Sequence, residues 1–377
     1  METILITGGA GFIGSNLVRH LNQKAFRLRI LDTLTPQIHG AIPQGLDWLG
    51  ERNTEFIRGS VTDRRIVETA LDGATAVVHL AAETGTGQSM YEVARYNEVN
   101  SQGTAVLLDI LANSNTRTVK RIVLTSSRSV YGEGAYVCDA GHGRVFPASR
   151  PAEQLARHEW DPICHLCKQP LRAVATVETD PARPASIYAA TKYAQEDLVR
   201  VASESLGINY AILRLQNVYG EGQSLKNPYT GILSIFSTKV RRGVQLGAFE
   251  DGLETRDFVH VDDVARSIHQ CLITSRQINQ VINVGSGIAT NVLEIATRLT
   301  ATLGSRPNIR VTAEYRLGDI RHNVADIDRL RTILEYEPRV GLTEGLERFA
   351  QWVLTQPLPE DLLDRANAEL RARKLMG

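Results

Sequence analysis

Three side chains in this sequence have the types and spacing needed to move a proton. Tyr188 and Lys192 lie four residues apart in the helix-like stretch from Ser186 to Ser205, so a phenol and an ammonium group share one helix face. The lysine charge can lower the pKa of the tyrosine from about 10 toward neutrality, which makes the phenol a candidate general base. Ser127, at the end of an apolar run, adds a hydroxyl donor. Because Tyr-x-x-x-Lys pairs are common on helices, the rest of the chain must decide whether these residues act together.

A glycine-rich turn near the N-terminus predicts a dinucleotide site. A short apolar run at residues 4–6 leads to glycines at 8, 11 and 14, and apolar residues then recur at helical spacing. In a strand, turn and helix of this kind, the glycines let the backbone approach a pyrophosphate at the positive end of the helix. A positively charged nicotinamide beside Ser127, Tyr188 and Lys192 would allow hydride to leave a carbon while a proton leaves its hydroxyl.

Asp32 indicates which dinucleotide is preferred. It ends the second apolar run, Leu28–Leu31, at about the distance from the glycines at which a carboxylate binds the adenosine ribose hydroxyls. A carboxylate at this position disfavours a 2′-phosphate, so the sequence favours NAD over NADP. The alternative is that Asp32 is a turn or cap residue.

Composition favours small-molecule chemistry. The 377 residues suffice for two or three domains, and 43% hydrophobic residues is ordinary for a globular protein. Lys plus Arg and Asp plus Glu both number 42, so no charge excess points to nucleic acid or an anionic membrane. Because the first strand is predicted to begin at Thr3 and no apolar run approaches roughly 18 residues, we expect no signal peptide and no membrane span. We therefore expect a cytoplasmic protein.

The elements that position these residues alternate between strand and helix. Strand-like apolar runs occur at residues 55–59, 76–82, 121–127, 210–215, 258–261 and 280–285, and helical patterns at 64–71, 96–111, 186–205, 234–242, 263–272, 292–303 and 342–355. This alternation predicts an α/β fold with a doubly wound parallel sheet, in which ligands bind at the carboxyl ends of the strands. Ser127 stands at such an end.

Residues 133–184 break this pattern and form a predicted insertion, with many prolines and three of the four cysteines. It contains two short pairs of candidate metal ligands, Cys138 with His142 and Cys164 with Cys167. Such pairs are typical of a tetrahedral zinc site, and a metal could supply folding energy to about fifty residues that lack apolar periodicity. The zinc would be structural, since four protein ligands leave no open position. Alternatives are free cysteines, a labile disulfide, or His158 and His165 as rival ligands.

Taken together, the motifs resemble those of the extended short-chain dehydrogenase/reductase family, and more narrowly its NAD-dependent nucleotide-sugar epimerases and dehydratases. The matching residues are Thr7-Gly8-x-x-Gly11-x-x-Gly14, His79-Leu80-Ala81-Ala82, Asn100, Thr125-Ser126-Ser127-Arg128-Ser129-Val130-Tyr131-Gly132 and Tyr188-x-x-x-Lys192. The resemblance implies a Rossmann domain that holds NAD and a smaller C-terminal domain for a nucleoside-diphosphate sugar. We expect the Rossmann domain at 1–214, with part of its core returning at 256–286, mainly substrate domain at 215–357, and a tail helix at 358–377.

The resemblance also assigns roles to single residues. It gives proton transfer to Tyr188, activation of that tyrosine and a nicotinamide-ribose contact to Lys192, and a hydrogen bond to the reacting oxygen to Ser127. Around the cofactor it places Gly8, Gly11, Phe12, Ile13, Gly14, Asp32, Ser60, Val61, Leu80, Ala81, Ala82, Asn100, Thr125, Tyr188, Lys192 and Val218. Around the nucleotide sugar it places Thr84, Thr86, Ser127, Arg128, Asn217, Arg256, Arg316 and Asp319. Arginine suits phosphate because its planar fork binds two oxygens, although each Arg has the alternative of a surface charge or a structural ion pair.

Two departures from the family pattern affect the cofactor site. Ser60 stands where an Asp usually faces the adenine, and Gln216 replaces the more usual aromatic or small residue beside the nicotinamide. The first departure weakens or replaces the adenine contact.

The residues after Ser127 favour one reaction over another. The family's 4,6-dehydratases carry an Asp-Glu pair there because elimination needs an acid and a base, whereas this chain has Arg128 and Ser129. An epimerase needs no such pair, since the 4-keto sugar turns over and hydride returns to its other face. Residues 83–92 and the cysteine-bearing insertion resemble enzymes acting on a dTDP-6-deoxyhexose such as dTDP-L-rhamnose. Alternatives are a UDP-hexose or UDP-uronate 4-epimerase, a 4-keto nucleotide-sugar reductase, or a non-catalytic NAD-binding protein.

The resemblance finally implies a homodimer. Helices near residues 96–111 and 186–205 would pair with their copies in a second chain. The apolar positions Ala194, Leu198, Val201 and Ala202 lie away from the face that carries Tyr188.

Overall fold

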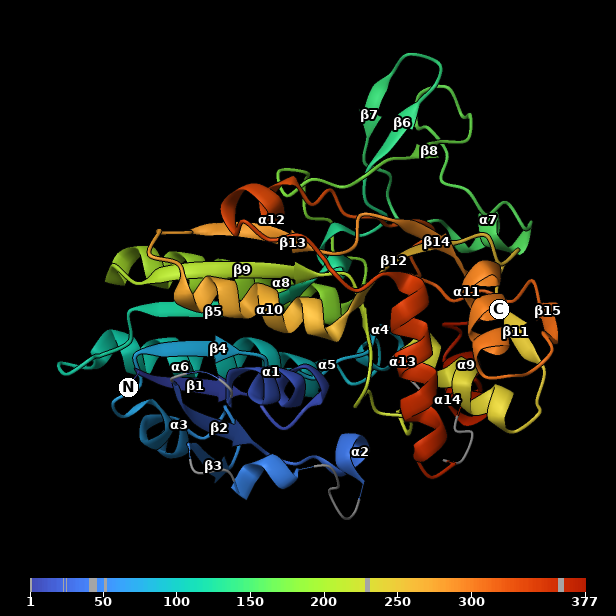
Figure 1. Cartoon of the computed structure of the whole chain (residues 1–377). Coiled ribbons are helices and arrows are strands. Elements are labelled where there is room, and N and C mark those ends of the chain that lie inside the picture. Colours follow the sequence, from blue (N-terminus) through green and yellow to red (C-terminus); the bar gives the residue numbers. More distant parts are fainter. Residues whose placement is uncertain are drawn as a thin grey trace.

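A seven-stranded parallel sheet forms the centre of the computed structural model, which describes residues 2–22, 24, 26–40, 46–50, 53–227, 231–358 and 363–377. The strands are β1 (Glu2–Thr7), β2 (Phe26–Asp32), β3 (Thr54–Arg58), β4 (Ala76–His79), β5 (Arg121–Ser127), β9 (Asn209–Leu215) and β13 (Gln280–Val284). Their spatial order is β13-β9-β5-β4-β1-β2-β3, and every neighbouring pair is parallel. The order reverses between β1 and β4, which opens a crevice at their carboxyl ends. The predicted doubly wound sheet is confirmed (Figure 1).

Helices cover both faces of this sheet, because successive side chains of each buried strand point to opposite faces. One face packs against α1 (Phe12–Asn22), α10 (Val261–Ile273) and α12 (Asp328–Ile333). The other packs against α3 (Arg64–Leu71), α6 (Gly103–Asn113) and α8 (Ile187–Leu206). Within β1, Ile4 and Ile6 join the first apolar cluster and Leu5 joins the second. The sheet is thus held rigidly between two apolar layers.

Two of these helices differ in detail from the sequence pattern. The stretch predicted as one helix at 96–111 consists of α5 (Val93–Tyr96), a π-helical segment at Asn97–Gln102 and α6. Helix α8 begins at the cap residue Ser186, whose Oγ accepts a hydrogen bond from the backbone N–H of Ala189 at 3.2 Å. It ends at Gly207, which has a left-handed φ of 66°. The cap fixes the first turn of α8, where Tyr188 lies.

A smaller unit packs beside the carboxyl ends of the sheet (Figure 1). It contains β10 (Asn217–Tyr219), β12 (Thr255–His260) and β14 (Ala289–Asn291) in one sheet, β11 (Leu246–Ala248) and β15 (Ile309–Val311) in another, and α9 (Ile232–Arg241), α11 (Val292–Thr302) and α13 (Leu342–Thr355). Tyr219, Phe258 and Phe349 belong to its separate apolar cluster. Of the range 256–286, α10 and β13 return to the large sheet, whereas β12 belongs to the smaller one.

Short elements complete the chain. They are α2 (Pro36–His39), the 3₁₀ turns at Asp47–Gly50 and Arg128–Tyr131, α4 (Thr86–Ser89), the insertion elements β6 (Tyr136–Cys138), β7 (Gly143–Val145), α7 (Ala152–Ala156) and β8 (Arg172–Ala173), and the tail helix α14 (Leu363–Ala372). The insertion strands form a small antiparallel sheet in the order β7-β6-β8. Residues 359–362 of the predicted tail helix lie outside the described residues. No helix in the described ranges combines the length and apolarity that crossing a membrane requires.

Candidate active site

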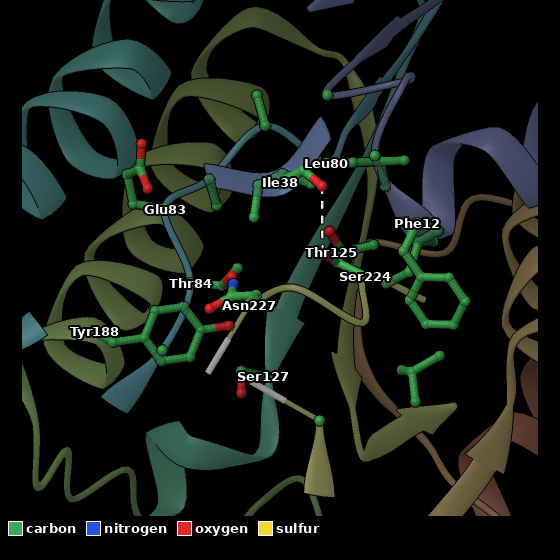
Figure 2. Close-up of a pocket in the computed structure, with 18 of the residues that line it drawn as sticks. Phe12, Ile38, Leu80, Glu83, Thr84, Thr125, Ser127, Tyr188, Ser224 and Asn227 are labelled. Carbon is green, nitrogen blue, oxygen red and sulfur yellow. Dashed lines mark hydrogen bonds between the residues drawn. The ribbon is translucent and has the colours of Figure 1, made fainter. Parts of the chain in front are cut away.

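One cavity of about 560 Å³ lies at the carboxyl ends of β1, β2, β4 and β5 and reaches the smaller unit (Figure 2). Most of the predicted site residues line it: Gly8, Gly11, Phe12, Ile13, Gly14, Asp32, Ser60, Val61, Leu80, Ala81, Ala82, Thr84, Thr86, Thr125, Ser127, Arg128, Tyr188, Asn217, Val218, Arg256 and Asp319. Asn100, Lys192 and Arg316 are not on its wall. Residues far apart in the sequence therefore meet in one space.

The glycine turn forms the floor of one end of the cavity. Gly8 has a φ of 67°, and a Cβ atom there would lie 2.7 Å from the backbone nitrogen of Ala81. A Cβ atom on Gly14 would lie 2.5 Å from the Cα of Gly9. Side chains are thus excluded on steric grounds where β1 meets α1, and bare backbone faces the cavity. This floor fits the pyrophosphate of a dinucleotide at the N-terminus of α1.

Asp32 fills the turn role that the sequence left open as the alternative, and ribose binding stays a prediction. Its Oδ2 accepts a hydrogen bond from the backbone N–H of Ala10 at 3.0 Å, and its Oδ1 accepts one from Leu34 at 2.8 Å. These bonds brace the glycine turn and hold the carboxylate at the cavity wall. The carboxylate fits the adenosine ribose of NAD at this position.

Hydrogen bonds to Asn100 hold the loop after β4 in place. The Asn100 Oδ1 accepts from the backbone N–H of Glu83 at 2.7 Å, and its Nδ2 donates to the Glu83 carbonyl at 3.1 Å and to the Thr191 Oγ1 at 2.9 Å. Tyr96 donates from its Oη to the Thr84 carbonyl at 2.7 Å. The π-helical segment therefore connects this loop to α8. A contact between Asn100 and NAD stays a prediction.

Ser127 and Tyr188 face each other inside the cavity. Ser127 ends β5 and Tyr188 stands in the first turn of α8, and Figure 2 shows the Tyr188 hydroxyl directed toward Ser127. The Ser127 Oγ accepts a hydrogen bond from the Ser129 Oγ at 3.0 Å and another from the Ser129 N–H at 3.2 Å. Lys192 lies one turn along α8 and is 3% exposed. These hydroxyl groups have the arrangement needed to hold and move the proton of a sugar hydroxyl.

The charges that act on Tyr188 differ from the sequence expectation. Burial raises the pKa of Tyr188, and hydrogen bonding with Ser127 and the charge of Arg128 both oppose that rise. Burial also lowers the pKa of Lys192 to about 7, against the raising effect of Glu196. The groups that oppose the rise in the Tyr188 pKa are therefore Ser127 and Arg128, and not Lys192 as the sequence led us to expect.

Guanidinium groups line the other end of the cavity. Burial and, to a smaller extent, the charge of Arg256 lower the pKa of Arg128 to about 9. The charge of Asp319 opposes this decrease. The Arg128 Nη1 is buried and has no hydrogen-bond partner within the described ranges. Arg256 donates from Nη1 to the carbonyls of Thr255 and Arg321, at 2.8 and 3.1 Å. A ligand with several anionic oxygens fits this wall.

Arg316 is held away from this wall. Its guanidinium lies 4.8 Å from the ring centre of Phe249, and its Nη2 donates to the Asn367 Oδ1 of α14 at 2.8 Å. The Arg316 side chain, which the family resemblance assigned to the substrate, is therefore hydrogen bonded to helix α14. Substrate contact by Arg316 stays a prediction.

Some residues of the cavity wall carried no signal in the sequence. They include Gln37, Ile38 and His39 of α2, and Gln223, Ser224 and Asn227 after β10. These residues lie in segments without periodicity, so only their tertiary position reveals them. Gln216 was noted as a departure, and both of its side-chain polar atoms are buried without a partner in the described part of the chain. The Asn217 Oδ1 is likewise buried without a partner in the described residues. The side chains of Gln216 and Asn217 can therefore both hydrogen bond to a ligand.

Known proteins resemble this chain over nearly its full length. A dTDP-L-rhamnose 4-epimerase from Burkholderia thailandensis is 39% identical over 368 residues, which are 97% of this chain and 97% of that protein. The crystal structure of UDP-glucose 4-epimerase from Thermotoga maritima with UDP-glucose is similar, with a TM-score of 0.74, 28% identity, and 93% and 98% of the two chains covered. UDP-glucuronic acid 4-epimerase from Bacillus cereus, in complex with UDP-glucuronic acid and NAD, has a TM-score of 0.76, 25% identity and coverage of 93% and 99%.

The family match covers most of the chain. It covers residues 4–151 and 167–285 and therefore includes the glycine turn, Ser127, Tyr188 and the strand β10. The same stretches supply most of the cavity wall, and Asp319 is among the wall residues beyond them. The chain belongs to the NAD-dependent epimerase/dehydratase family, within the extended short-chain dehydrogenases/reductases.

Proposed function

We propose that this enzyme is an NAD-dependent 4-epimerase of a nucleoside-diphosphate sugar, and that its substrate is a dTDP-6-deoxyhexose such as dTDP-L-rhamnose. The observation that carries the proposal is the pairing of Ser127 with Tyr188 in a cavity that also holds the glycine turn and Arg256. The cavity thus offers a dinucleotide site, a proton-transfer pair and a cationic wall. The Burkholderia thailandensis relative supports the choice of sugar nucleotide.

Different residues of the chain carry out proton transfer and substrate binding. Tyr188 takes the proton of the C4 hydroxyl, while Ser127 hydrogen bonds to the same oxygen and orients it. NAD held at the glycine turn and Asp32 would supply the acceptor for the C4 hydride and the hydride that is returned. Arg256 and Asn217 hold the diphosphate while the 4-keto sugar turns over, and Tyr188 then gives its proton back. One proton donor serves both halves of the reaction, so no second acid is needed.

The residues beside Ser127 argue against elimination of water. Arg128 and Ser129 stand where a 4,6-dehydratase carries its acid and base, and Ser129 is engaged in hydrogen bonds to Ser127. A reductase of a 4-keto sugar or an epimerase of a UDP-hexose or UDP-uronate would use the same tyrosine and serine. Cofactor turnover separates the reductase, since a reductase consumes reduced nicotinamide in proportion to product.

The experiment that tests the proposal supplies purified protein with dTDP-L-rhamnose and no added cofactor. We expect NMR to show formation of the 4-epimer. The final ratio of the two epimers should be the same whichever epimer is supplied. UDP-glucose and UDP-glucuronate, tested in parallel, should react more slowly. Faster reaction of a UDP-sugar would overturn the choice of substrate. In a separate assay that supplies a 4-keto nucleotide sugar and reduced nicotinamide, stoichiometric consumption of the reduced nicotinamide would overturn epimerisation.

Finer features belong to the same proposal. The Rossmann domain spans residues 1–214 with the insertion at 133–184, and the substrate domain spans mainly 215–357. The enzyme works in the cytoplasm as a homodimer, and its insertion carries a structural zinc ion.

A further inference from the structure

The insertion brings four candidate metal ligands together, and none of the four lines the cavity. The Cys138 Sγ lies 3.3 Å from the His142 Nδ1 and 3.5 Å from the Cys167 Sγ, and the Cys164 Sγ lies 3.4 Å from the His142 Nδ1. All four ligand atoms lie within 4.8 Å of one another. Around a tetrahedral zinc, ligand atoms at ordinary Zn–S and Zn–N distances are roughly 3.4–3.8 Å apart. The cysteines are free. We infer that Cys138, His142, Cys164 and Cys167 bind one structural zinc ion.

The backbone folds into two turns that deliver these ligands. Strand β6 ends at Cys138, and the N–H of Gly141 donates to the Cys138 carbonyl at 3.1 Å, which brings His142 back toward the sulfur. The N–H of Lys168 donates to the Cys164 carbonyl at 2.9 Å and closes the second turn. Gly141 has a φ of 88° and Lys168 one of 61°. A lysine in this left-handed region is strained, and such strain is retained where a site requires the turn.

The structure also decides between the rival histidines. His158 stacks on Trp160, with ring centres 5.2 Å apart, and neither His158 nor His165 belongs to the ligand cluster. Two of the three sulfurs, those of Cys138 and Cys164, belong to buried residues, whereas His142 is exposed. Three thiolates and one imidazole favour zinc over magnesium or calcium, which take oxygen ligands.

The insertion has only a small apolar core of its own. Its apolar cluster contains Tyr136, Cys138, Val145, Cys164 and Leu171, so two of its five buried members are themselves ligands. A core of this size cannot compensate the chain entropy of about fifty residues, and metal binding supplies the missing folding free energy. The family match is interrupted at residues 152–166, which include Cys164.

The zinc-bound unit supports one wall of the cavity through Arg150. That side chain donates to the Glu133 carboxylate at 3.1 Å, to the Glu250 carboxylate at 2.9 Å and to the carbonyl of Asp319 at 3.0 Å. Asp319 lines the cavity beside Arg128. The metal therefore stabilises a segment that positions the nucleotide-sugar end of the site, while the glycine turn at the opposite end is built without it.

Elemental analysis of tag-free protein tests the site directly. We expect about one zinc per chain, and His142→Ala and Cys164→Ser should lower this to less than about a tenth. His165→Ala removes an exposed histidine from the same turn and should leave the zinc content unchanged. Loss of zinc in His165→Ala, or metal-free wild-type protein, would overturn the assignment.

Cobalt provides a measurement that does not depend on the folding of a variant. Wild-type protein refolded with Co²⁺ should show the intense visible and sulfur-to-metal absorption of a tetrahedral thiolate site. Chelation should expose residues 133–184 to protease and raise the KM for the nucleotide sugar severalfold, while bound NAD is retained. An insertion that stays protease-resistant in chelated, metal-free protein would contradict the structural role.

Discussion

At the scale of single residues, the proposed reaction depends on one phenol. Tyr188→Phe removes the group that takes and returns the proton but leaves the ring and its burial, so kcat should fall by about 10²-fold or more. NAD should remain bound, because the glycine turn and Asp32 are untouched. Turnover is followed by NMR of the two epimers, and bound NAD is released by denaturation and quantified. The matched control is Tyr193→Phe, on the same helix but not on the cavity wall. Unchanged turnover in Tyr188→Phe would eliminate the tyrosine as base.

A second single-residue prediction concerns stability and pH. Burial raises the pKa of Glu254 to about 7, Arg256 opposes the rise, and the Oε2 atom is buried without a hydrogen-bond partner in the described ranges. Because the folded state binds this proton more tightly than the unfolded state, the stabilisation is complete below the ordinary glutamate pKa and is lost as pH rises through about 7. Its loss between about pH 5 and pH 8 amounts to up to about 3 kcal/mol.

Glu254→Gln isolates this effect, since the amide stays neutral at every pH. Urea unfolding at several pH values should show that the free energy of unfolding falls less steeply in the variant than in the wild type. Glu153→Gln, at an exposed position of α7, should keep the wild-type slope. Parallel curves for wild type and Glu254→Gln would show that Glu254 does not titrate in this range.

At the scale of elements, the insertion is joined to the rest of the molecule by a buried ion-pair network. The Arg150 side chain is 1% exposed, and its partners Glu133 and Glu250 are 2% and 5% exposed. Arg150→Met leaves the buried Glu133 carboxylate without its cation and leaves Glu250 paired with Arg321 alone, at 3.2 Å, so we expect a loss of about 3–5 kcal/mol in the free energy of unfolding. The KM for the nucleotide sugar should rise as well, because the Asp319 carbonyl loses its donor.

The matched control lies in the same insertion. Arg157 pairs with Glu159 at 2.9 Å, but the two side chains are 58% and 51% exposed. Arg157→Met should therefore leave the free energy of unfolding close to that of the wild type. Urea unfolding of both variants measures the difference. Equal effects would show that burial of Arg150 adds nothing to the anchoring of the insertion.

Elements could be predicted from the sequence wherever local pattern and tertiary structure agree. The strand, turn and helix around Gly8 and the helix predicted at 186–205 follow from glycine spacing and helical periodicity, whereas the capping role of Ser186 was seen only in the structure. The π-helical segment around Asn100 could not be predicted, since its hydrogen bonds to the loop after β4 are long-range. Arg316 is the clearest example of a contact that could not be predicted from the sequence. Its motif was visible in the sequence, but its partner, Asn367, lies in the tail helix, fifty-one residues away.

At the scale of the whole molecule, the cavity depends on contacts that no local pattern specifies. The large sheet supplies the glycine turn and Ser127, the smaller unit supplies Arg256, and the insertion supports Asp319 through Arg150. Tyr91 of the loop after β4 donates to the Glu369 carboxylate at 3.0 Å, so the tail helix closes over the same region. The sequence predicted about half of the residues of the wall, because their motifs resembled those of a family. How the tail and insertion meet them became visible only in the structure.

The last prediction concerns assembly. On α8, Val201 is 55% exposed and Leu198 is 37% exposed, on a surface away from the cavity. Pairing of α6 and α8 with their copies across a twofold axis would bury this apolar face. We expect light scattering at micromolar concentration to give twice the mass of one chain, and Val201→Glu to give a monomer, since the axis brings two like charges together. Leu354→Glu, at a 58% exposed position of α13, should remain dimeric. Both variants should retain NAD, because the glycine turn and Asp32 lie within one chain. A monomeric wild type, or a Val201→Glu protein that stays dimeric, would place the interface elsewhere.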